Sequence, residues 1–285
     1  MNPGVKRPNA LAAGFDLSHA CINKMGGAFM RHYSACIEWL FAEEGDSFPD
    51  RIRRAHASGL TAIEFWRWTD KDLDAIETAL KETGLVVTSL VAEPMIALTD
   101  AANRQAWLTG LAESVAMAKR LGAPALIAQA GDDLPGVTRE EQRRALTETL
   151  KAGAGILAGS GVRLGVEPLN IRIDHIGYFL DSTVEGLDII DDVARPEIGI
   201  VYDIYHSAVM EERTEEVLEG RLDRVIHVHV ADHPGRNDPG SGGIDLAHRL
   251  GWIFANGYNG SVGLEYRPTK PGADPVRAAI ASLGG

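Results

Sequence analysis

Three observations in the sequence predict a closed (βα)8 barrel. Strand-like and helix-like segments alternate almost from end to end, and eight segments are strand-like. This alternation is typical of parallel α/β folds, and eight units favour a closed barrel over a doubly wound open sheet. The length of 285 residues suits one domain, because barrels of about 250 residues commonly form a single domain.

The predicted strands are short apolar runs, and the predicted helices between them are rich in Ala, Leu, Glu, Lys and Arg. The strands cover residues 34–41, 62–66, 86–91, 125–129, 163–167, 199–203, 225–230 and 262–265. Clear helical patterns cover 72–82, 104–121 and 140–158, and Gly84 and Gly122 stand where two helices should end. Residues 1–33 lack periodicity. We interpret them as an N-terminal extension that covers the barrel or contacts another subunit, before a barrel domain over 34–285.

Four strands in the second half end on side chains that bind metals. They are the runs V-R-L-G-V-E, I-G-I-V-Y-D, V-I-H-V-H-V and S-V-G-L-E. Read with period 2, they place one set of residues inside the barrel: Arg163, Gly165, Glu167, Gly199, Val201, Asp203, His227, His229, Gly263 and Glu265. Because the C-terminal strand ends of such a barrel meet at one face, Glu167, Asp203, His229 and Glu265 predict a divalent-cation site.

Each of these residues also has an ordinary structural interpretation. Glu167 or Glu265 alone could be an ion-paired carboxylate that closes the barrel end. His227 lies further from the strand end than His229, so we expect it in packing or in a hydrogen bond to a ligand. His206, three residues after Asp203, could reach a substrate hydroxyl or be an ordinary loop histidine.

Composition excludes several classes of protein. With 28 basic and 40 acidic residues the net charge is -12, which disfavours nucleic acid and anionic membranes as partners. Two cysteines are too few for a disulfide scaffold and fit a reducing compartment. No apolar stretch approaches the ~20 residues of a membrane span, and the N-terminus lacks the apolar core of a signal peptide. We therefore expect a cytoplasmic protein, with a homo-oligomer left open.

Several strings resemble the hydroxypyruvate isomerase family of the xylose-isomerase-like TIM barrel superfamily. That superfamily also holds ketose 3-epimerases and apurinic endonucleases. The strings are V-E-P-L-N with the later D-x-x-G-Y-F-L, then Y-D-I-Y-H, H-V-x-V-A-D-x-P-G-R-N-D-P and G-L-E-Y-R-P. The likeness runs from about Ser34 onward, and P-G-R-N-x-P is its most specific part. The first 33 residues have no counterpart that we recognise.

The resemblance implies roles for particular residues. Glu167, Asp203, His229 and Glu265 match the metal ligands, and Glu167 and Glu265 also match a pair of acid/base carboxylates. His206 and Arg236 match residues that hold substrate oxygens. One departure bears on the substrate: hydroxypyruvate isomerases often have glutamine at the position of His229, whereas sugar epimerases have histidine.

Two further residues at the predicted mouth are candidate substrate contacts. Glu64 and Trp66 leave the second strand in I-E-F-W-R-W, where the carboxylate could meet a substrate hydroxyl and the indole could exclude water. The tryptophan could equally cap the core. For Arg236, the alternative to binding a substrate carboxylate is a structural pair with Asp232 or Asp238.

These residues predict a metal-assisted isomerase that acts on a small keto acid or sugar through a cis-enediolate. Our specific hypothesis is the conversion of hydroxypyruvate to tartronate semialdehyde. The metal would be Mg, Mn or Co, with Zn as an alternative. Other functions left open are a ketose 3-epimerase, a lyase or decarboxylase for a larger sugar acid, a non-catalytic sugar-binding protein and, more remotely, an apurinic endonuclease.

Overall fold

A computed structural model describes residues 33–43 and 45–284, and within them nine parallel strands form one sheet. The strands are β1 (Tyr33–Cys36), β2 (Ala62–Glu64), β3 (Val86–Val87), β4 (Ser89–Val91), β5 (Ala125–Ala128), β6 (Arg163–Val166), β7 (Ile198–Asp203), β8 (Val225–Val230) and β9 (Val262–Leu264). The protein is a (βα)8 barrel, as the alternation predicts. The predicted extension lies outside the described residues except for Tyr33, which opens β1.

The barrel closes through a strand that is divided in two. The sheet order is β3-β2-β1-β9-β8-β7-β6-β5-β4, and its two ends, β3 and β4, are separated in the chain only by Thr88. The first half pairs with β2 and the second half pairs with β5. The predicted strand 86–91 is therefore one barrel position that changes its neighbour part-way along.

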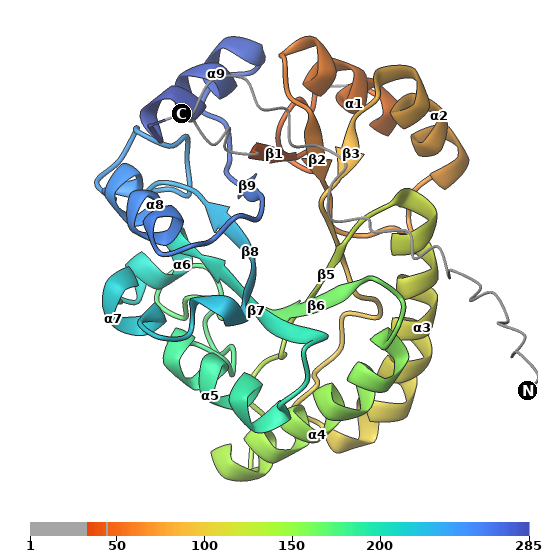
Figure 1. Cartoon of the computed structure of the whole chain (residues 1–285), viewed down its shortest axis with the longest axis vertical. Helices are drawn as coiled ribbons and strands as arrows, with labels where there is room; N and C mark the ends of the chain where they lie inside the picture. The colour runs from red at the N-terminus through yellow and green to blue at the C-terminus, as the bar shows by residue number, and fades with distance from the viewer. Residues whose placement is uncertain (1–32, 44, 285) are drawn as a thin grey trace, which may run out of the picture. The chain divides into compact units, whose positions relative to one another are not determined.

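Helices surround the ring of strands (Figure 1). They are α1 (Phe48–Ala57), α2 (Leu73–Thr83), α3 (Arg104–Leu121), α4 (Arg139–Leu157), α5 (Thr183–Val193), α6 (Ile204–Val209), α7 (Thr214–Leu218), α8 (Leu246–Ala255) and α9 (Ala273–Ser282), with short 3-10 turns η2 (Ala101–Asn103) and η3 (Leu222–Arg224). Gly84 and Gly122 end α2 and α3 in the left-handed conformation, as predicted.

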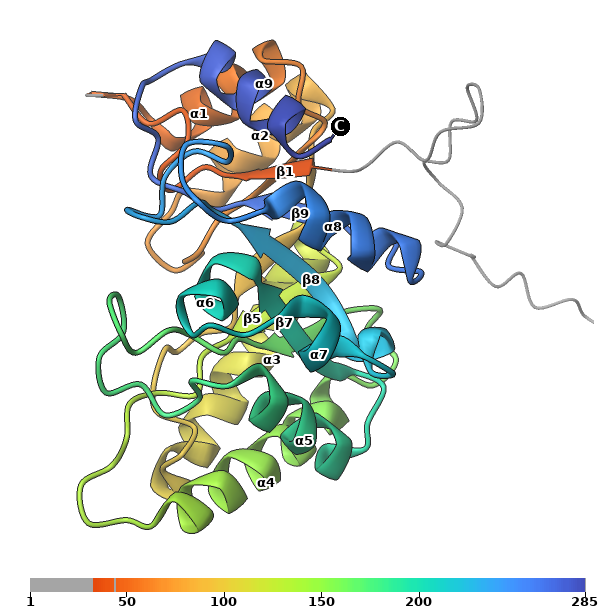
Figure 2. The same cartoon turned by 90° about the vertical axis from the view of Figure 1, so that its left-hand side faces the viewer.

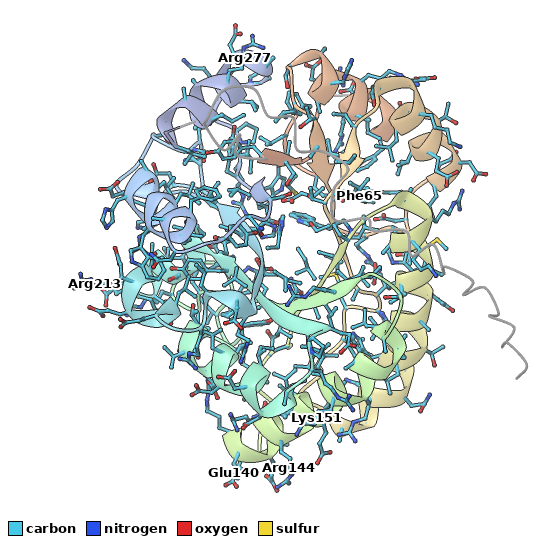
Figure 3. All side chains as sticks on the ribbon, viewed as in Figure 1. Phe65, Glu140, Arg144, Lys151, Arg213 and Arg277 are labelled. Carbon is cyan, nitrogen blue, oxygen red and sulfur yellow. The ribbon has the colours of Figure 1, made fainter. Side chains whose placement is uncertain are left out.

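Helix α4 illustrates how the outer layer is built. Its charged side chains Glu140, Arg144 and Lys151 are exposed, and Glu140 and Arg144 lie at the outer edge of the molecule (Figure 3). Leu146 and Leu150, four residues apart, are fully buried, which is the spacing of a helix with one apolar face. Among the described residues, no helix combines the length and the apolar character that crossing a membrane requires.

The prediction for the first strand was too long. After Cys36 the backbone turns, with the amide of Leu40 donating to the carbonyl of Cys36 at 3.0 Å. Ile37 and Leu40 are nevertheless fully buried. Their apolar character reflects burial beneath the loop, which a short apolar run does not distinguish from a strand.

Strand β8 carries a bulge that places an isoleucine against two glycines of the inner face. Val225 lies opposite Ile200 and His227 opposite Val201, so Ile226 is an extra residue between two paired positions. Its side chain takes the space that a Cβ would need at Gly165 and Gly199. Glycine at positions 165 and 199, which the period-2 pattern placed on the inner face, therefore leaves room for the side chain of Ile226.

We predict that Gly199→Ala destabilises the protein by about 1–3 kcal/mol, because the new methyl would overpack the interior. The added Cβ would lie 2.5 Å from the carbonyl oxygen of Arg224 and 2.5 Å from Cγ2 of Ile226. Urea unfolding measures the change. Gly155→Ala is the control, since nothing lies within 4 Å of that Cβ on α4; equal stability of the two variants would contradict the packing argument.

Candidate functional site

Four side chains from neighbouring strand ends share one buried space. Glu167 follows β6, Asp203 ends β7, His229 lies near the end of β8, and Glu265 follows β9. Each is at most 6% exposed, and one candidate ligand atom from each lies within 4.8 Å of those from the other three. The structure therefore brings together the residues that the strand pattern singled out.

His229 stands at the centre of the cluster and contacts carboxylates on both sides. Its Nδ1 is 3.0 Å from Oε1 of Glu167 and 3.5 Å from Oε2 of Glu265, while its Nε2 is 3.2 Å from Oε1 of Glu64. Burial lowers the pKa of His229, but Glu265 and Glu64 raise it more, so the pKa lies well above the usual range. Nδ1 is the nitrogen that faces the other candidate ligands.

Asp203 presents one oxygen to the protein backbone and the other to the site. Its Oδ1 accepts the amide hydrogens of Tyr205 at 2.7 Å and His206 at 3.3 Å, at the start of α6. Its Oδ2 is buried and has no hydrogen-bond partner among the described residues. Burial raises the pKa of Asp203 to about 7, against the lowering effect of Arg236.

Arg236 contacts the cluster from the loop after β8. Its Nη2 donates to Oε2 of Glu265 at 2.5 Å and lies 3.6 Å from Oδ2 of Asp203. The guanidinium also packs on the rings of Trp39 and Tyr205, 5.1 Å and 5.5 Å from their centroids. These contacts place the arginine in the site, in contrast to the alternative of a pair with Asp232 or Asp238.

Asp232 instead organises the loop that carries Arg236. Its carboxylate accepts backbone amide hydrogens from His233, Gly240, Gly242 and Ile244 at 2.8–3.0 Å. Figure 2 shows this loop and the loop after β6 on the same side of the barrel. The P-G-R-N string therefore has a structural anchor immediately before it.

Trp66 contacts both the carboxylate of Glu265 and the ring of Trp39. Its Nε1 donates to Oε1 of Glu265 at 2.6 Å, and its ring meets Trp39 edge to face, with centroids 5.0 Å apart. Since Arg236 holds the other oxygen of Glu265, the plane of this carboxylate is defined by two donors.

His206 directs one ring nitrogen toward the site. Its Nδ1 lies 3.2 Å from the backbone amide nitrogen of Asn170 and 2.7 Å from Nδ2 of the same residue. Two donors at Nδ1 assign the proton of the neutral ring to Nε2, which is 3.5 Å from Oδ2 of Asp203. Burial, with Arg236 and His175, holds the pKa of His206 well below its usual range.

Sequence reasoning missed Asn170. Its amide orientation follows from its partners, because Oδ1 accepts from the backbone of Ile173 and Asp174 while Nδ2 also donates to Asp174 at 2.8 Å. The only available signal was its place in V-E-P-L-N, three residues after Glu167, which does not reveal a contact with His206.

Glu64 lies inside the barrel, next to His227 and His229. It is 2% exposed. Its Oε2 accepts hydrogen bonds from Ser34 at 2.8 Å and Thr88 at 3.1 Å, and lies 2.8 Å from Nε2 of His227. His227 thus contacts Glu64, and Glu64 in turn contacts His229. His227 therefore reaches a candidate ligand through Glu64.

The donor set fits a divalent cation. Three carboxylates and an imidazole nitrogen supply the oxygen and nitrogen donors that such ions take. The buried Oδ2 of Asp203, without a hydrogen-bond partner among the described residues, is a polar atom that a cation would satisfy.

Residues 52–284 match the xylose isomerase-like TIM barrel family. The chain belongs to this family. A putative hydroxypyruvate isomerase of Mus musculus is 33% identical over 250 residues, which are 83% of this chain and 89% of the relative. The hydroxypyruvate isomerase of Escherichia coli (strain K12) is 30% identical over 247 residues, 84% and 94% of the two chains. Because relatives this similar over most of the chain are named as isomerases, this family member is an isomerase.

The architecture of the family also appears in solved structures. A crystal structure described as an AP endonuclease, family 2, from Brucella melitensis superposes with a TM-score of 0.81. It is 24% identical and covers 88% of this chain and 99% of its own. At that identity the similarity establishes the fold that this family member shares.

We predict that Mn²⁺ stabilises the wild-type protein and has little effect on Asp203→Asn, which keeps the size of the side chain and loses an anionic ligand. At 100 times the dissociation constant, binding should add about 2.7 kcal/mol to the free energy of unfolding. Thermal unfolding with and without Mn²⁺ measures this. The exposed Asp223→Asn serves as control; the same stabilisation in both variants would speak against Asp203 as a ligand.

Proposed function

We propose that this protein is a metal-assisted isomerase of small 2-keto acids that converts hydroxypyruvate to tartronate semialdehyde. The observation that carries the proposal is the position of Glu167 and Glu265, whose carboxylates lie 3.0 Å and 3.5 Å from Nδ1 of His229 in a buried cluster. Two carboxylates beside one small space can take and return a proton on a substrate bound between them.

Glu167, Asp203, His229 and Glu265 would hold the cation, which we propose to be Mg, Mn or Co, with Zn as an alternative. When bound, it would supply positive charge near the carbonyl and the adjacent hydroxyl of the substrate. His229 would contribute Nδ1, since Nε2 faces Glu64.

The proton transfer conserves all atoms. A glutamate removes a proton from C3 of hydroxypyruvate, which gives a cis-enediolate, and a proton is returned at C2, while a hydroxyl hydrogen moves from the oxygen on C3 to the oxygen on C2. Glu167 and Glu265 can divide the two roles, or one of them can carry the proton both ways. Both routes require a carboxylate held still, and Trp66 and Arg236 do this for Glu265.

The remaining polar groups fit the substrate's oxygens. Arg236 offers a planar donor to the carboxylate of a keto acid. His206 offers the Nε2 hydrogen to a hydroxyl or carbonyl oxygen, and Trp66 with Trp39 forms an aromatic wall that limits water. For Glu64, whose Oε2 is contacted by Ser34, Thr88 and His227 and whose Oε1 lies 3.2 Å from Nε2 of His229, we propose a supporting role in place of a substrate contact.

A second function remains a candidate because of His229. A ketose 3-epimerase, or a lyase or decarboxylase for a larger sugar acid, would use the same carboxylate pair, and histidine at this position is typical of the sugar epimerases. Neither assignment needs a basic surface, whereas an apurinic endonuclease would, and the net charge is -12.

We predict that Glu265→Gln lowers kcat by about 100- to 10,000-fold, because it removes an acid/base group and an anionic ligand. Steady-state rates at saturating Mn²⁺ measure the loss. Glu219→Gln is the control, since Glu219 is exposed after α7. A near-normal rate for Glu265→Gln would rule out the proposed mechanism.

The substrate is tested with three- and four-carbon keto acids and with five- and six-carbon ketoses, each with Mg²⁺, Mn²⁺ and Co²⁺. We expect hydroxypyruvate to react and Arg236→Ala to raise KM and lower kcat, because the variant loses both a donor to the substrate carboxylate and one of the two donors that hold Glu265. Turnover of a ketose alone would favour the epimerase. In heavy water, a protein that only binds sugars would leave the carbon-bound hydrogens unexchanged.

A further inference from the structure

We propose that Glu64 is a positioning residue that sets the orientation and tautomer of His229 for cation binding, and that Gly263 provides the space for their contact. This inference rests on the proposed role of His229 as a metal ligand. It adds a buried layer beneath the ligands that holds one of them in the binding geometry.

The carboxylate of Glu64 is held as an anion by several donors. Ser34 and Thr88 donate to Oε2 at 2.8 Å and 3.1 Å, and Nε2 of His227 lies 2.8 Å from the same oxygen. A charged, acceptor-only group therefore occupies this position.

The second oxygen of Glu64 sets the state of His229. Oε1 lies 3.2 Å from Nε2 of His229, at ion-pair distance, and has no hydrogen-bond partner among the described residues. Since a carboxylate can only accept, this oxygen favours a hydrogen on Nε2. Nδ1 faces the carboxylate of Glu167 at 3.0 Å, so without a cation both ring nitrogens face carboxylates. A cation that takes the place of the hydrogen on Nδ1 would leave the remaining ring hydrogen on Nε2, toward Glu64. The opposite tautomer would direct an N–H at the cation. Carboxylates that hold metal-binding histidines in this way are a general feature of metal sites.

Gly263 is the second, independent observation. A Cβ at this position would lie 2.6 Å from Cδ2 of His229 and 2.7 Å from Oε2 of Glu64, and it would overlap Oε1. Any larger residue would push the two side chains apart. The same short strand, β9, thus provides room for the contact at Gly263 and leads to a candidate ligand at Glu265.

Glu64, His227 and His229 also lie close enough to hold a cation of their own. The hydroxyl groups of Ser34 and Thr88 already donate to Oε2, so Oε1 would be the only carboxylate oxygen of this group left for a cation, against three carboxylates in the other cluster. We therefore expect one cation per chain.

The test is titration of the full-length chain, freed of metal by a chelator, with Mn²⁺ alone in a calorimeter. We expect Glu64→Gln to weaken binding about 10- to 100-fold. If the amide oxygen of the new glutamine stays with Ser34 and Thr88, its NH2 group faces His229 and favours a hydrogen on Nδ1 in place of Nε2. If the amide turns over, its NH2 group faces the hydroxyls of Ser34 and Thr88, which then lose their acceptor.

A matched control separates this effect from the loss of any buried carboxylate. Glu93 is 4% exposed and also follows a strand end, and it accepts from Arg67 at 2.6 Å and Thr69 at 3.0 Å. Glu93→Gln should keep the Mn²⁺ affinity of the wild type. Circular dichroism and thermal unfolding check that each variant is folded.

Gly263→Ala tests the contact between Glu64 and His229 while all charged groups are retained. It replaces Glu64→Gln as the decisive variant if Glu64→Gln does not fold. The methyl should weaken Mn²⁺ binding, whereas Gly155→Ala on the outer surface of α4 should not. Wild-type affinity in a folded Glu64→Gln or Gly263→Ala variant would overturn the inference, and so would two cations per wild-type chain. A wild-type protein that binds no divalent cation would overturn the proposed metal site itself.

Discussion

The arrangement of the site depends on the burial of three carboxylates in one small space. Glu167, Asp203 and Glu265 lie within a few ångströms of one another at the ends of β6, β7 and β9, and like charges in a medium of low polarity repel strongly. The protein places His229 and Arg236 among them. The chemistry we propose uses the same crowding, because a cation that enters would relieve it.

The strands of the barrel and the segments that follow them supply different groups to the site. Side chains from the strands and strand ends form the cluster, and the interior beneath it is filled by Glu64, His227 and the hydroxyls of Ser34 and Thr88. The segments that follow β7 and β8 supply the groups suited to substrate binding, with His206 on helix α6 and Arg236 in the loop after β8. Asn170 holds the ring of His206, and the turn around Asp232 precedes Arg236. Rigid strands suit ligand geometry, and loops can vary with the substrate.

Local pattern accounts for most of the fold and for the core of the candidate site. Period-2 alternation and the helix-forming segments identified every barrel strand, because both signals arise within a few neighbouring residues. Local pattern did not reveal that the chain turns after Cys36, that Thr88 divides a strand, or that Ile226 forms a bulge. Each of these three features depends on contacts with neighbouring parts of the barrel, and the pattern of a few consecutive residues does not predict such contacts.

Strand pattern alone was enough to predict that Glu167, Asp203, His229 and Glu265 stand at the same end of neighbouring strands, since parallel strands in a barrel end at one face. Tertiary structure alone decided what surrounds them. Glu64 on β2 reaches His229 on β8 across the interior, and this contact exists only because β9 carries glycine at 263. Which ligand a side chain supports is set by distances between strands far apart in the chain, and those distances follow from closing the barrel.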